Sequence, residues 1–376
     1  MKVVFRTDAS IKIGTGHVMR CLTLAKDLVE KGAKVQFICR DHSGNLIERI
    51  RQEGFELYTL ITANNCHFER SQQSLKSKLT YTDEESPTPK LAHAEWLGVL
   101  QKQDANDCQP ILEIINPDWL IVDHYALDQA WQYALKPYYQ QLMVIDDLGD
   151  RNHLCDLLLD QNYGSTEAKY QSRVPAHCKV LVGAHYALLR PEFAQWRETS
   201  LKRREQVQNI KTLLITLGGV DPDNYTGQIL SELAKTQLDK DIEIIVIMGA
   251  TAPHLANVKN QAETMPIKTT VKTNVINMAE LMTHADLAIG AAGATTWERC
   301  CLGLPSIQLV IAENQRQIAK ALAKDNVVKM IENSKQLPGL VNTANQWIND
   351  MSQQAAKICD GLGCQRVVDQ VLIMDA

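Results

Sequence analysis

The chain has 376 residues, of which 45% are hydrophobic and 22% are charged, which is typical of a globular protein of about two domains. Its formal net charge of -5 argues against a nucleic-acid partner, and its apolar runs are too short to span or insert into a membrane. The opening sequence MKVVFRTDAS reads as a strand and not as a signal peptide, and the ten cysteines form no CxxC pair. We therefore expect a cytoplasmic protein with free thiols.

A glycine turn, Gly14-Thr15-Gly16-His17, follows the first predicted strand, residues 3–6. The apolar residues after it have helical spacing up to a stop at Gly32: Val18, Cys21, Leu22, Ala25, Leu28 and Val29. The unpaired N–H groups of a helix start attract phosphate or polarised oxygen, and an imidazole there suits proton transfer at neutral pH. The motif lacks the third glycine of GxGxxG. On these residues alone, plain topology and a functional role for His17 stay equal alternatives.

Short apolar runs alternate with helical patterns through the first half of the chain, which is typical of a parallel sheet covered on both faces. The predicted strands are residues 3–6, 34–39, 56–60, 119–123, 142–146, 157–159 and 180–182. Residues 62–108 interrupt the alternation. Within them, residues 66–90 read as a surface insertion and residues 93–105 as a helix.

A charged segment, residues 197–208, precedes a second set of strands and helices. The strands are predicted at residues 212–217, 243–248, 287–289, 306–310 and 327–330, and the helices at 225–234, 279–283, 296–302 and 315–323. We therefore predict an α/β protein with two Rossmann-like parallel-sheet domains, residues 1–200 and 201–376, that face each other across a cleft. Ligands of such folds bind at the carboxyl ends of the strands.

Two glycine sites lie at predicted strand ends in the second domain. Gly218 and Gly219 follow the strand at 212–217, and the sequence GAAGATT, residues 290–296, follows the strand at 287–289. Small residues such as Gly293 let a phosphate approach the backbone, and Thr295 or Thr296 can donate a hydroxyl. Glu298 then lies in the first turn of a helix. It can accept two hydrogen bonds from a ribose diol or, equally, act as a capping-box acid.

Two of these blocks, FRTDASIKIGTGHVMRC (residues 5–21) and GAAGATTWERCCLGLPSI (residues 290–307), resemble the PseG family of UDP-sugar hydrolases of the pseudaminic acid pathway. Five further blocks match in the same order: IVDHYALD (121–128), VIDDLGDRNHLCDLLLDQN (144–162), YALLRPEF (186–193), LLITLGGVDPDN (213–224) and AENQ (312–315). The match covers nearly the whole chain. Residues 66–90 and the far C-terminus match poorly.

The resemblance implies a GT-B-like fold similar to the MurG glycosyltransferases, in which the last helix packs back on the first domain. It also implies hydrolysis of UDP-2,4-diacetamido-2,4,6-trideoxy-β-L-altropyranose to UDP and the free sugar, without a metal or another cofactor. Water would attack the anomeric carbon with inversion, and His17 would be the general base. By the same resemblance Glu298 contacts the ribose, Asn314 contacts the substrate and Tyr125 lines the sugar side.

Some roles and functions stay open on the sequence. Asp8 and Asp123 end strands near the expected cleft, where they could orient His17 or water, or only cap turns. The glycine turn at Gly14, Thr15 and Gly16 is expected to contact the substrate. A GT-B glycosyltransferase with an acceptor other than water needs the same UDP site, and a non-catalytic UDP-sugar sensor is a third reading. The negative net charge and the lack of an apolar, basic segment favour the hydrolase.

Overall fold

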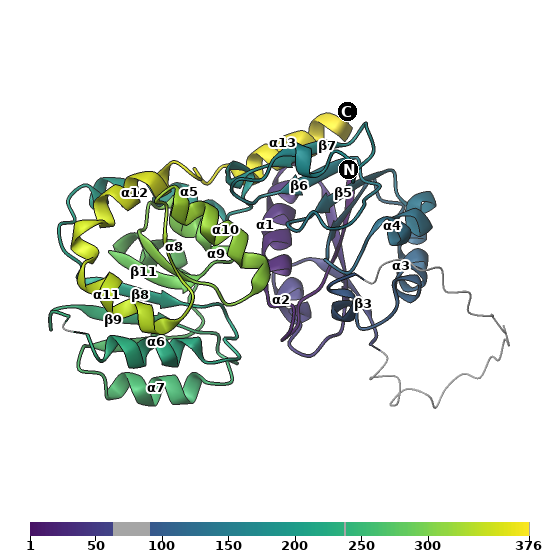
Figure 1. Cartoon of the computed structure of the whole chain (residues 1–376). Coiled ribbons are helices and arrows are strands. Elements are labelled where there is room, and N and C mark those ends of the chain that lie inside the picture. The colour runs from purple at the N-terminus through teal and green to yellow at the C-terminus, as the bar shows by residue number, and fades with distance from the viewer. Residues whose placement is uncertain (63–90, 237, 376) are drawn as a thin grey trace, which may run out of the picture. The chain divides into compact units, whose positions relative to one another are not determined.

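The computed structural model describes residues 1–62, 91–236 and 238–375 (Figure 1). Contacts divide them into two compact units, the first built mainly from residues 1–159 and 168–180 and the second mainly from residues 160–167 and 181–374. Each unit holds one parallel sheet, as predicted. The expected insertion at 66–90 lies outside the described residues. The domain boundary at residue 200, the cleft and the packing of the last helix stay predictions.

The first sheet has the strand order β3-β2-β1-β4-β5-β6-β7. Its strands are β1 (Lys2–Thr7), β2 (Lys34–Arg40), β3 (Glu56–Leu60), β4 (Trp119–Asp123), β5 (Gln141–Ile145), β6 (Leu157–Asp160) and β7 (Lys179–Val182). The chain order reverses between β1 and β4, where Thr7 lies opposite Asp123. Such a switch point opens a crevice at the carboxyl ends of the strands, where ligands of this fold class bind.

Helices cover both faces of the first sheet (Figure 1). They are α1 (Gly16–Glu30) and α2 (Ile47–Gln52) on one side, and α3 (Gln101–Ile115) and α4 (Gln129–Leu135) on the other. The predicted apolar face of α1 is buried except at Val29, which is 46% exposed. Short 3-10 turns complete this part of the chain: η2 (Ala94–Leu97), η3 (Lys136–Tyr138) and η4 (Glu167–Lys169).

The prediction of a helix over residues 93–105 is wrong. The chain makes only the short turn η2 there, and α3 begins later, at Gln101. Gly98 ends the turn with φ 74°, a left-handed conformation that a helix interior does not adopt, and Leu100 is extended. The apolar residues therefore keep a helical spacing although the helix is interrupted, and Gly98 is the residue at which it is interrupted.

The second sheet has the strand order β10-β9-β8-β11-β12-β13. Its strands are β8 (Thr212–Thr216), β9 (Glu243–Ile247), β10 (Thr269–Lys272), β11 (Leu287–Ala291), β12 (Ser306–Leu309) and β13 (Lys329–Ile331). Side chains of β8 alternate between two cores, with Leu213 and Ile215 in one and Leu214 in the other. The switch point of this sheet lies between β8 and β11, so the two glycine turns after these strands lie side by side.

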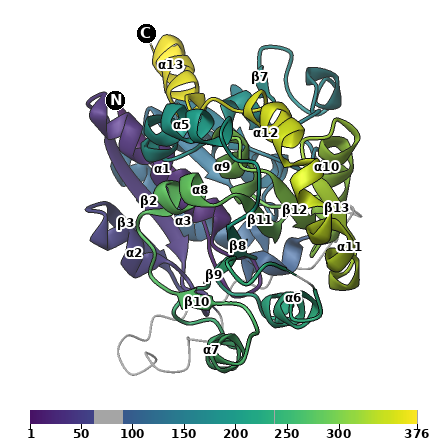
Figure 2. The same ribbon diagram turned by 90° about the vertical axis from the view of Figure 1, so that its left-hand side faces the viewer.

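The two cores of the second unit are closed by helices. One core takes in α6 (Tyr225–Leu233), α7 (Leu255–Glu263) and α11 (Leu337–Asn342), and Figure 2 shows α6 beside α7. The other takes in α5 (Pro191–Arg204), α8 (Met278–His284), α9 (Thr295–Cys301), α10 (Glu313–Lys324) and α12 (Ile348–Ala356). The remaining elements are η5 (Ala184–Tyr186), η6 (Ser334–Gln336), η7 (Ala344–Gln346) and α13 (Gly363–Asp375). Most of the charged segment at 197–208 is thus the end of α5.

Candidate active site

His17 lies in the first turn of α1, beside the end of β4. Its Nδ1 is 2.6 Å from Oδ1 of Asp123, whose side chain is fully buried. Because a carboxylate only accepts hydrogen bonds, Nδ1 carries the proton of this bond and Nε2 is the nitrogen left to take up another. The strand pairing that sets Thr7 opposite Asp123 brings together residues that are 106 positions apart in the chain.

Asp123 is held in its charged form. Burial alone would raise the pKa of Asp123, but the guanidinium of Arg20 and the ring of His17 hold it well below its usual range. Arg20 donates hydrogen bonds to both carboxylate oxygens of Asp123, with Nε 2.6 Å from Oδ2 and a terminal nitrogen 2.7 Å from Oδ1. This two-pronged pair fixes the plane of the carboxylate, and with it the orientation of the imidazole.

Tyr125 completes the surroundings of His17. Its ring stands edge-on to the imidazole, with ring centroids 4.6 Å apart. Its hydroxyl donates to Oδ2 of Asp147 at 2.9 Å, and Arg20 reaches the same oxygen at 2.5 Å. Tyr125 is therefore fixed beside the imidazole by the same arginine that holds Asp123.

Two aromatic side chains that were not predicted from the sequence lie beside this group. Trp96 stacks on Tyr125 with ring centroids 5.6 Å apart, and His93 lies 4.3 Å from Trp96. Burial and the neighbouring Arg151 lower the pKa of His93. Both residues come from the segment around η2, where the sequence predicts a helix over residues 93–105.

Asp8 does not contact His17. Its Oδ1 accepts hydrogen bonds from the guanidinium of Arg6 at 2.7 Å and from the backbone N–H of Arg40 at 2.6 Å. Its Oδ2 lies 3.3 Å from Nε2 of His124. Of the two acids that the sequence analysis named, the structure brings Asp123 to His17 and ties Asp8 into a separate buried network.

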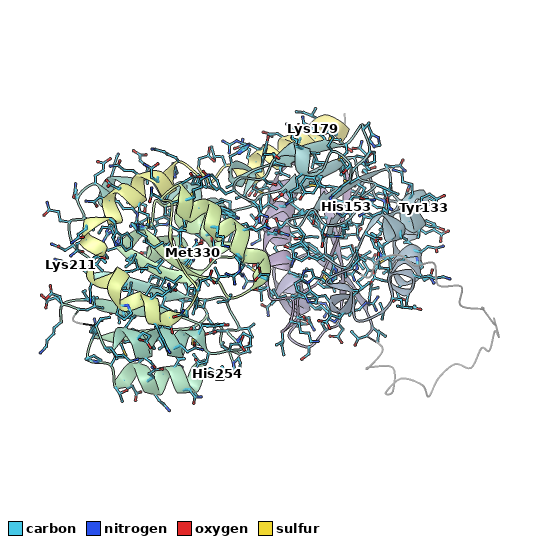
Figure 3. The ribbon with its side chains drawn as sticks, in the orientation of Figure 1. Tyr133, His153, Lys179, Lys211, His254 and Met330 are labelled. Carbon is cyan, nitrogen blue, oxygen red and sulfur yellow. The ribbon has the colours of Figure 1, made fainter. Side chains whose placement is uncertain are left out.

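Asp146 belongs to the packing of the first unit. It accepts from the backbone N–H groups of Leu148 and Gly149, and Arg151 is 3.0 Å from its Oδ1. His153, which is labelled in Figure 3, is a buried histidine whose Nε2 lies 3.6 Å from the same carboxylate. Asp146 therefore holds the loop after β5 in place and is a structural acid.

The glycine turn after β8 is closely packed. Gly218 has φ 98°, which favours glycine, and the carbonyl of Gly219 accepts from the backbone N–H of Gly249 at 3.0 Å. The carboxylate of Asp221 accepts from two backbone N–H groups, those of Tyr225 and Thr226, at the start of α6. Asp221 therefore helps to cap α6 together with the N-cap residue Asn224, whose side chain accepts from the backbone N–H of Gly227.

Glu298 lies in the first turn of α9, where the sequence placed it. Its carboxylate makes no hydrogen bond to the backbone of α9 in the described part of the chain, which goes against the capping-box alternative. Arg190 is 3.9 Å away, and 17% of the Glu298 side chain is exposed. Burial raises the pKa of Glu298 to about 7, although Arg190 and Arg299 oppose the shift.

The other predicted ligands of the second unit lie around the same turn. Gly293 and Thr295 are half-buried, and Thr296 is buried beneath them. Asn314 lies in α10, but its side chain is outside the described part of the structure.

A comparison with family models matches residues 212–361 to the glycosyltransferase family 28 C-terminal domain. Among whole proteins, the chain is 27% identical to the UDP-2,4-diacetamido-2,4,6-trideoxy-beta-L-altropyranose hydrolase of Campylobacter jejuni, over 86% of this chain and 97% of that protein. It is 30% identical to the spore coat polysaccharide biosynthesis protein SpsG of Bacillus subtilis, over 65% of this chain and 70% of that protein. The chain belongs to the PseG family.

Structural likeness places the PseG-family chain among GT-B proteins. The crystal structure of Acinetobacter baumannii MurG matches 99% of both chains with a TM-score of 0.67 and 17% identity. This likeness confirms the predicted fold class. The chain also matches the protein MJ1062 of Methanocaldococcus jannaschii with 26% identity over 84% of its own length, and spans 57% of that relative.

No helix of the described residues is long and apolar enough to cross a membrane. No group of three or more histidine, cysteine, aspartate or glutamate side chains in the same residues could hold a metal ion.

Proposed function

We propose that the protein hydrolyses UDP-2,4-diacetamido-2,4,6-trideoxy-β-L-altropyranose to UDP and free 2,4-diacetamido-2,4,6-trideoxy-L-altrose, a step of pseudaminic acid biosynthesis. Membership of the PseG family makes the chain an enzyme that processes nucleotide sugars. The substrate is the one in the name of the Campylobacter jejuni relative. The observation that carries the proposal is the His17–Asp123 pair at the switch point of the first sheet.

In the proposed reaction, Nε2 of His17 takes a proton from water as the water oxygen attacks the anomeric carbon. The bond from that carbon to the diphosphate oxygen breaks, and UDP leaves with the electron pair, which inverts the configuration. The imidazolium that forms is stabilised by the charged carboxylate of Asp123 at 2.6 Å. Tyr125 and the turn at Gly14, Thr15 and Gly16 would border the sugar.

The second unit would hold the UDP. A Cβ on Gly218 or Gly219 would have no other atom within 4 Å, and one on Gly293 would lie 3.8 Å from the side-chain amide nitrogen of Gln315. A diphosphate could therefore approach the N–H groups of these glycines, which would stabilise the charge that develops on the leaving group. Glu298 would accept hydrogen bonds from the ribose diol. Two threonine hydroxyls and one amide are the further ligands that we propose: Thr295, Thr296 and Asn314.

A GT-B glycosyltransferase is the alternative, because the MurG likeness and the matched C-terminal domain suit a sugar acceptor as well as water. Incubation of the protein with the UDP-sugar alone separates the two. The hydrolase releases UDP without any acceptor, whereas a transferase needs one. We place the reaction in the cytoplasm, since nine cysteines of the described chain are free.

The same assay tests His17. His17→Asn should lower kcat by about a hundredfold or more, the usual contribution of a positioned base, with little change in UDP affinity. His177→Asn is the matched control, because His177 is an exposed histidine of the same unit that is paired with Asp156. Turnover by His17→Asn close to that of the wild type would contradict the role of His17 as base.

A further inference from the structure

Arg299 is a fully buried arginine under the glycine turn that follows β11. One terminal nitrogen donates to the carbonyl of Ala291 at 2.8 Å and to the hydroxyl of Thr296 at 3.2 Å, and the other donates to the hydroxyl of Thr295 at 3.0 Å. All three acceptors are neutral. Among the described residues no carboxylate makes an ion pair with Arg299, and the adjacent Glu298 attracts it only through space.

The backbone of the turn leaves room for this guanidinium. A Cβ on Gly290 would lie 2.4 Å from a terminal nitrogen of Arg299 and 2.9 Å from the carbonyl oxygen of Thr216. Real Cβ atoms do not come so close, so the glycine lets the cation lie directly against the end of β11. The charge is thus built into the turn and is not an incidental surface group.

The hydrogen bonds of Arg299 determine whether the hydroxyls of Thr295 and Thr296 can still donate or accept a hydrogen bond to a ligand. A hydroxyl has one proton to donate and two lone pairs that accept. The hydroxyl of Thr296 accepts from Arg299 and from the amide of Gln308 at 3.1 Å, so both of its lone pairs are used. The proton of Thr295 cannot point at Arg299, which is itself a donor. Both hydroxyls are therefore left as donors, and Thr295 is half-buried.

Arg204 is a second buried arginine of the same unit, and its surroundings differ. It donates to the backbone carbonyls of Met282, Ala285 and Leu302, at the ends of α8 and α9. The carboxyl ends of helices carry partial negative charge, which compensates a cation. Arg299 instead has its guanidinium under the start of α9, where the partial charge is positive. Burial lowers the pKa of both arginines, to about 10 for Arg299 and to about 9 for Arg204, so the two differ in the groups that accept their hydrogen bonds and not in the direction of the pKa shift.

We infer that Arg299 is a positioning residue for a nucleoside diphosphate: it puts a positive charge beneath the turn at 290–296 and makes the hydroxyl of Thr295 a donor to the phosphates. The inference rests on the proposed function in taking UDP as the ligand of this unit. It goes beyond that function in assigning the recognition of the diphosphate to a residue that need not touch it. A bound diphosphate would supply a negative charge near Arg299, which makes no ion pair with a carboxylate among the described residues.

Calorimetric titration with UDP and with uridine tests the inference, because the two ligands differ only in the diphosphate. Arg299→Met should weaken the binding of UDP by about tenfold or more, because the turn loses the positive charge beneath it and the hydrogen bond that orients Thr295, and that of uridine by less than about twofold. Arg299→Lys keeps the positive charge but lacks the planar guanidinium with its two terminal nitrogens. Its UDP affinity should lie between that of the wild type and that of Arg299→Met. Arg204→Met is the control; it should lower the melting temperature and leave the ratio of the two affinities unchanged.

An unchanged ratio of UDP to uridine affinity in Arg299→Met, or an equal loss of both, would overturn the inference. If Arg299→Met fails to fold, the ratio for Arg299→Lys decides, since a purely structural role would leave it at the wild-type value. The proposed function fails separately. A wild-type protein that prefers UDP through Arg299 but releases no UDP from the UDP-sugar contradicts the hydrolase and leaves this inference standing.

Discussion

Asp123 shares its negative charge between His17 and Arg20. Asp123→Asn removes the charge that stabilises the imidazolium and can present an amide N–H to Nδ1, which would favour the wrong tautomer. We expect kcat to fall by about tenfold to a thousandfold, by analogy with the aspartate of catalytic triads. UDP affinity should not change, since its proposed ligands lie in the other unit. Initial rates of UDP release and calorimetry measure the two quantities.

The matched control is Asp128→Asn. Asp128 lies in the loop after β4 and accepts from the backbone N–H of Ala130 at the start of α4, a role that asparagine fills equally well. If Asp123→Asn turns over as fast as Asp128→Asn, the carboxylate only packs the site and does not assist His17.

Glu298 gives a prediction about pH. Because burial raises its pKa to about 7, the carboxylate that would accept from the ribose diol is ionised above that pH and protonated below it. UDP should therefore bind about tenfold more weakly at pH 6 than at pH 8 when only the ionised form binds. Glu298→Gln should bind UDP weakly at both values and lack this part of the pH dependence. If UDP affinity changes with pH equally in the wild type and in Glu298→Gln, Glu298 does not contact the ribose.

At the scale of elements, the glycine turn after β8 depends on a close approach of two backbones. A Cβ on Gly249 would lie 2.1 Å from the carbonyl oxygen of Gly219. Gly249→Ala should therefore lower the free energy of unfolding by about 1–3 kcal/mol, as overpacking does, and weaken UDP binding. Urea unfolding and calorimetry measure both effects.

Gly339→Ala is the control for Gly249→Ala. Gly339 lies in α11 with open space around its Cα, so an alanine there should stabilise the helix by about 0.5–1 kcal/mol and leave UDP binding alone. A Gly249→Ala protein as stable as the wild type, with unchanged UDP affinity, would show that the turn tolerates the added methyl group.

The predicted bounds of β3 and β4 coincide with the observed ones. For β4 the reason is a continuous apolar run that is buried on both faces, whereas β3 buries only Leu60 and was predicted from a short run of strand-favouring residues. The strand β10 was missed because its four residues, TTVK, are half-buried or exposed and carry one aliphatic side chain. The helix α7 was missed for the same reason, since it buries only Val258 and Ala262.

At the scale of the molecule, buried carboxylates concentrate in the first unit, where Asp8, Asp104, Asp123 and Asp146 are fully buried. Burial alone would raise their pKa values, but arginine and histidine partners hold all four below the usual range. These groups take up protons more readily in the unfolded chain, where carboxyls titrate near pH 4. Their stabilisation is therefore present above about pH 4 and is lost as the pH falls below it.

Urea unfolding at pH 6, 4 and 3 measures this loss, and hydrogen exchange followed by mass spectrometry locates it. We expect the free energy of unfolding to fall below pH 4, with the earliest loss of protection around β1 and β4. A free energy that is constant or rises between pH 4 and pH 3 would mean that these ion pairs are not retained in solution.

The candidate site was only partly predictable. The motifs placed His17 and Glu298 at the starts of helices, where the structure has them. The sequence could not choose between Asp8 and Asp123, because both end strands and only the register of β1 against β4 decides which one meets His17. Trp96 was missed because its ring reaches Tyr125 through a turn of the chain that the helical pattern concealed.

The central claim is that water attacks the anomeric carbon with His17 as base, and hydrolysis of the UDP-sugar in ¹⁸O-labelled water tests it most directly. Mass spectrometry should find the label on the free sugar and none on UDP, and proton NMR should show the inverted anomer first. His17→Asn should form this product about a hundredfold more slowly. Label in UDP, retained configuration, or no UDP release without an added acceptor would contradict the account.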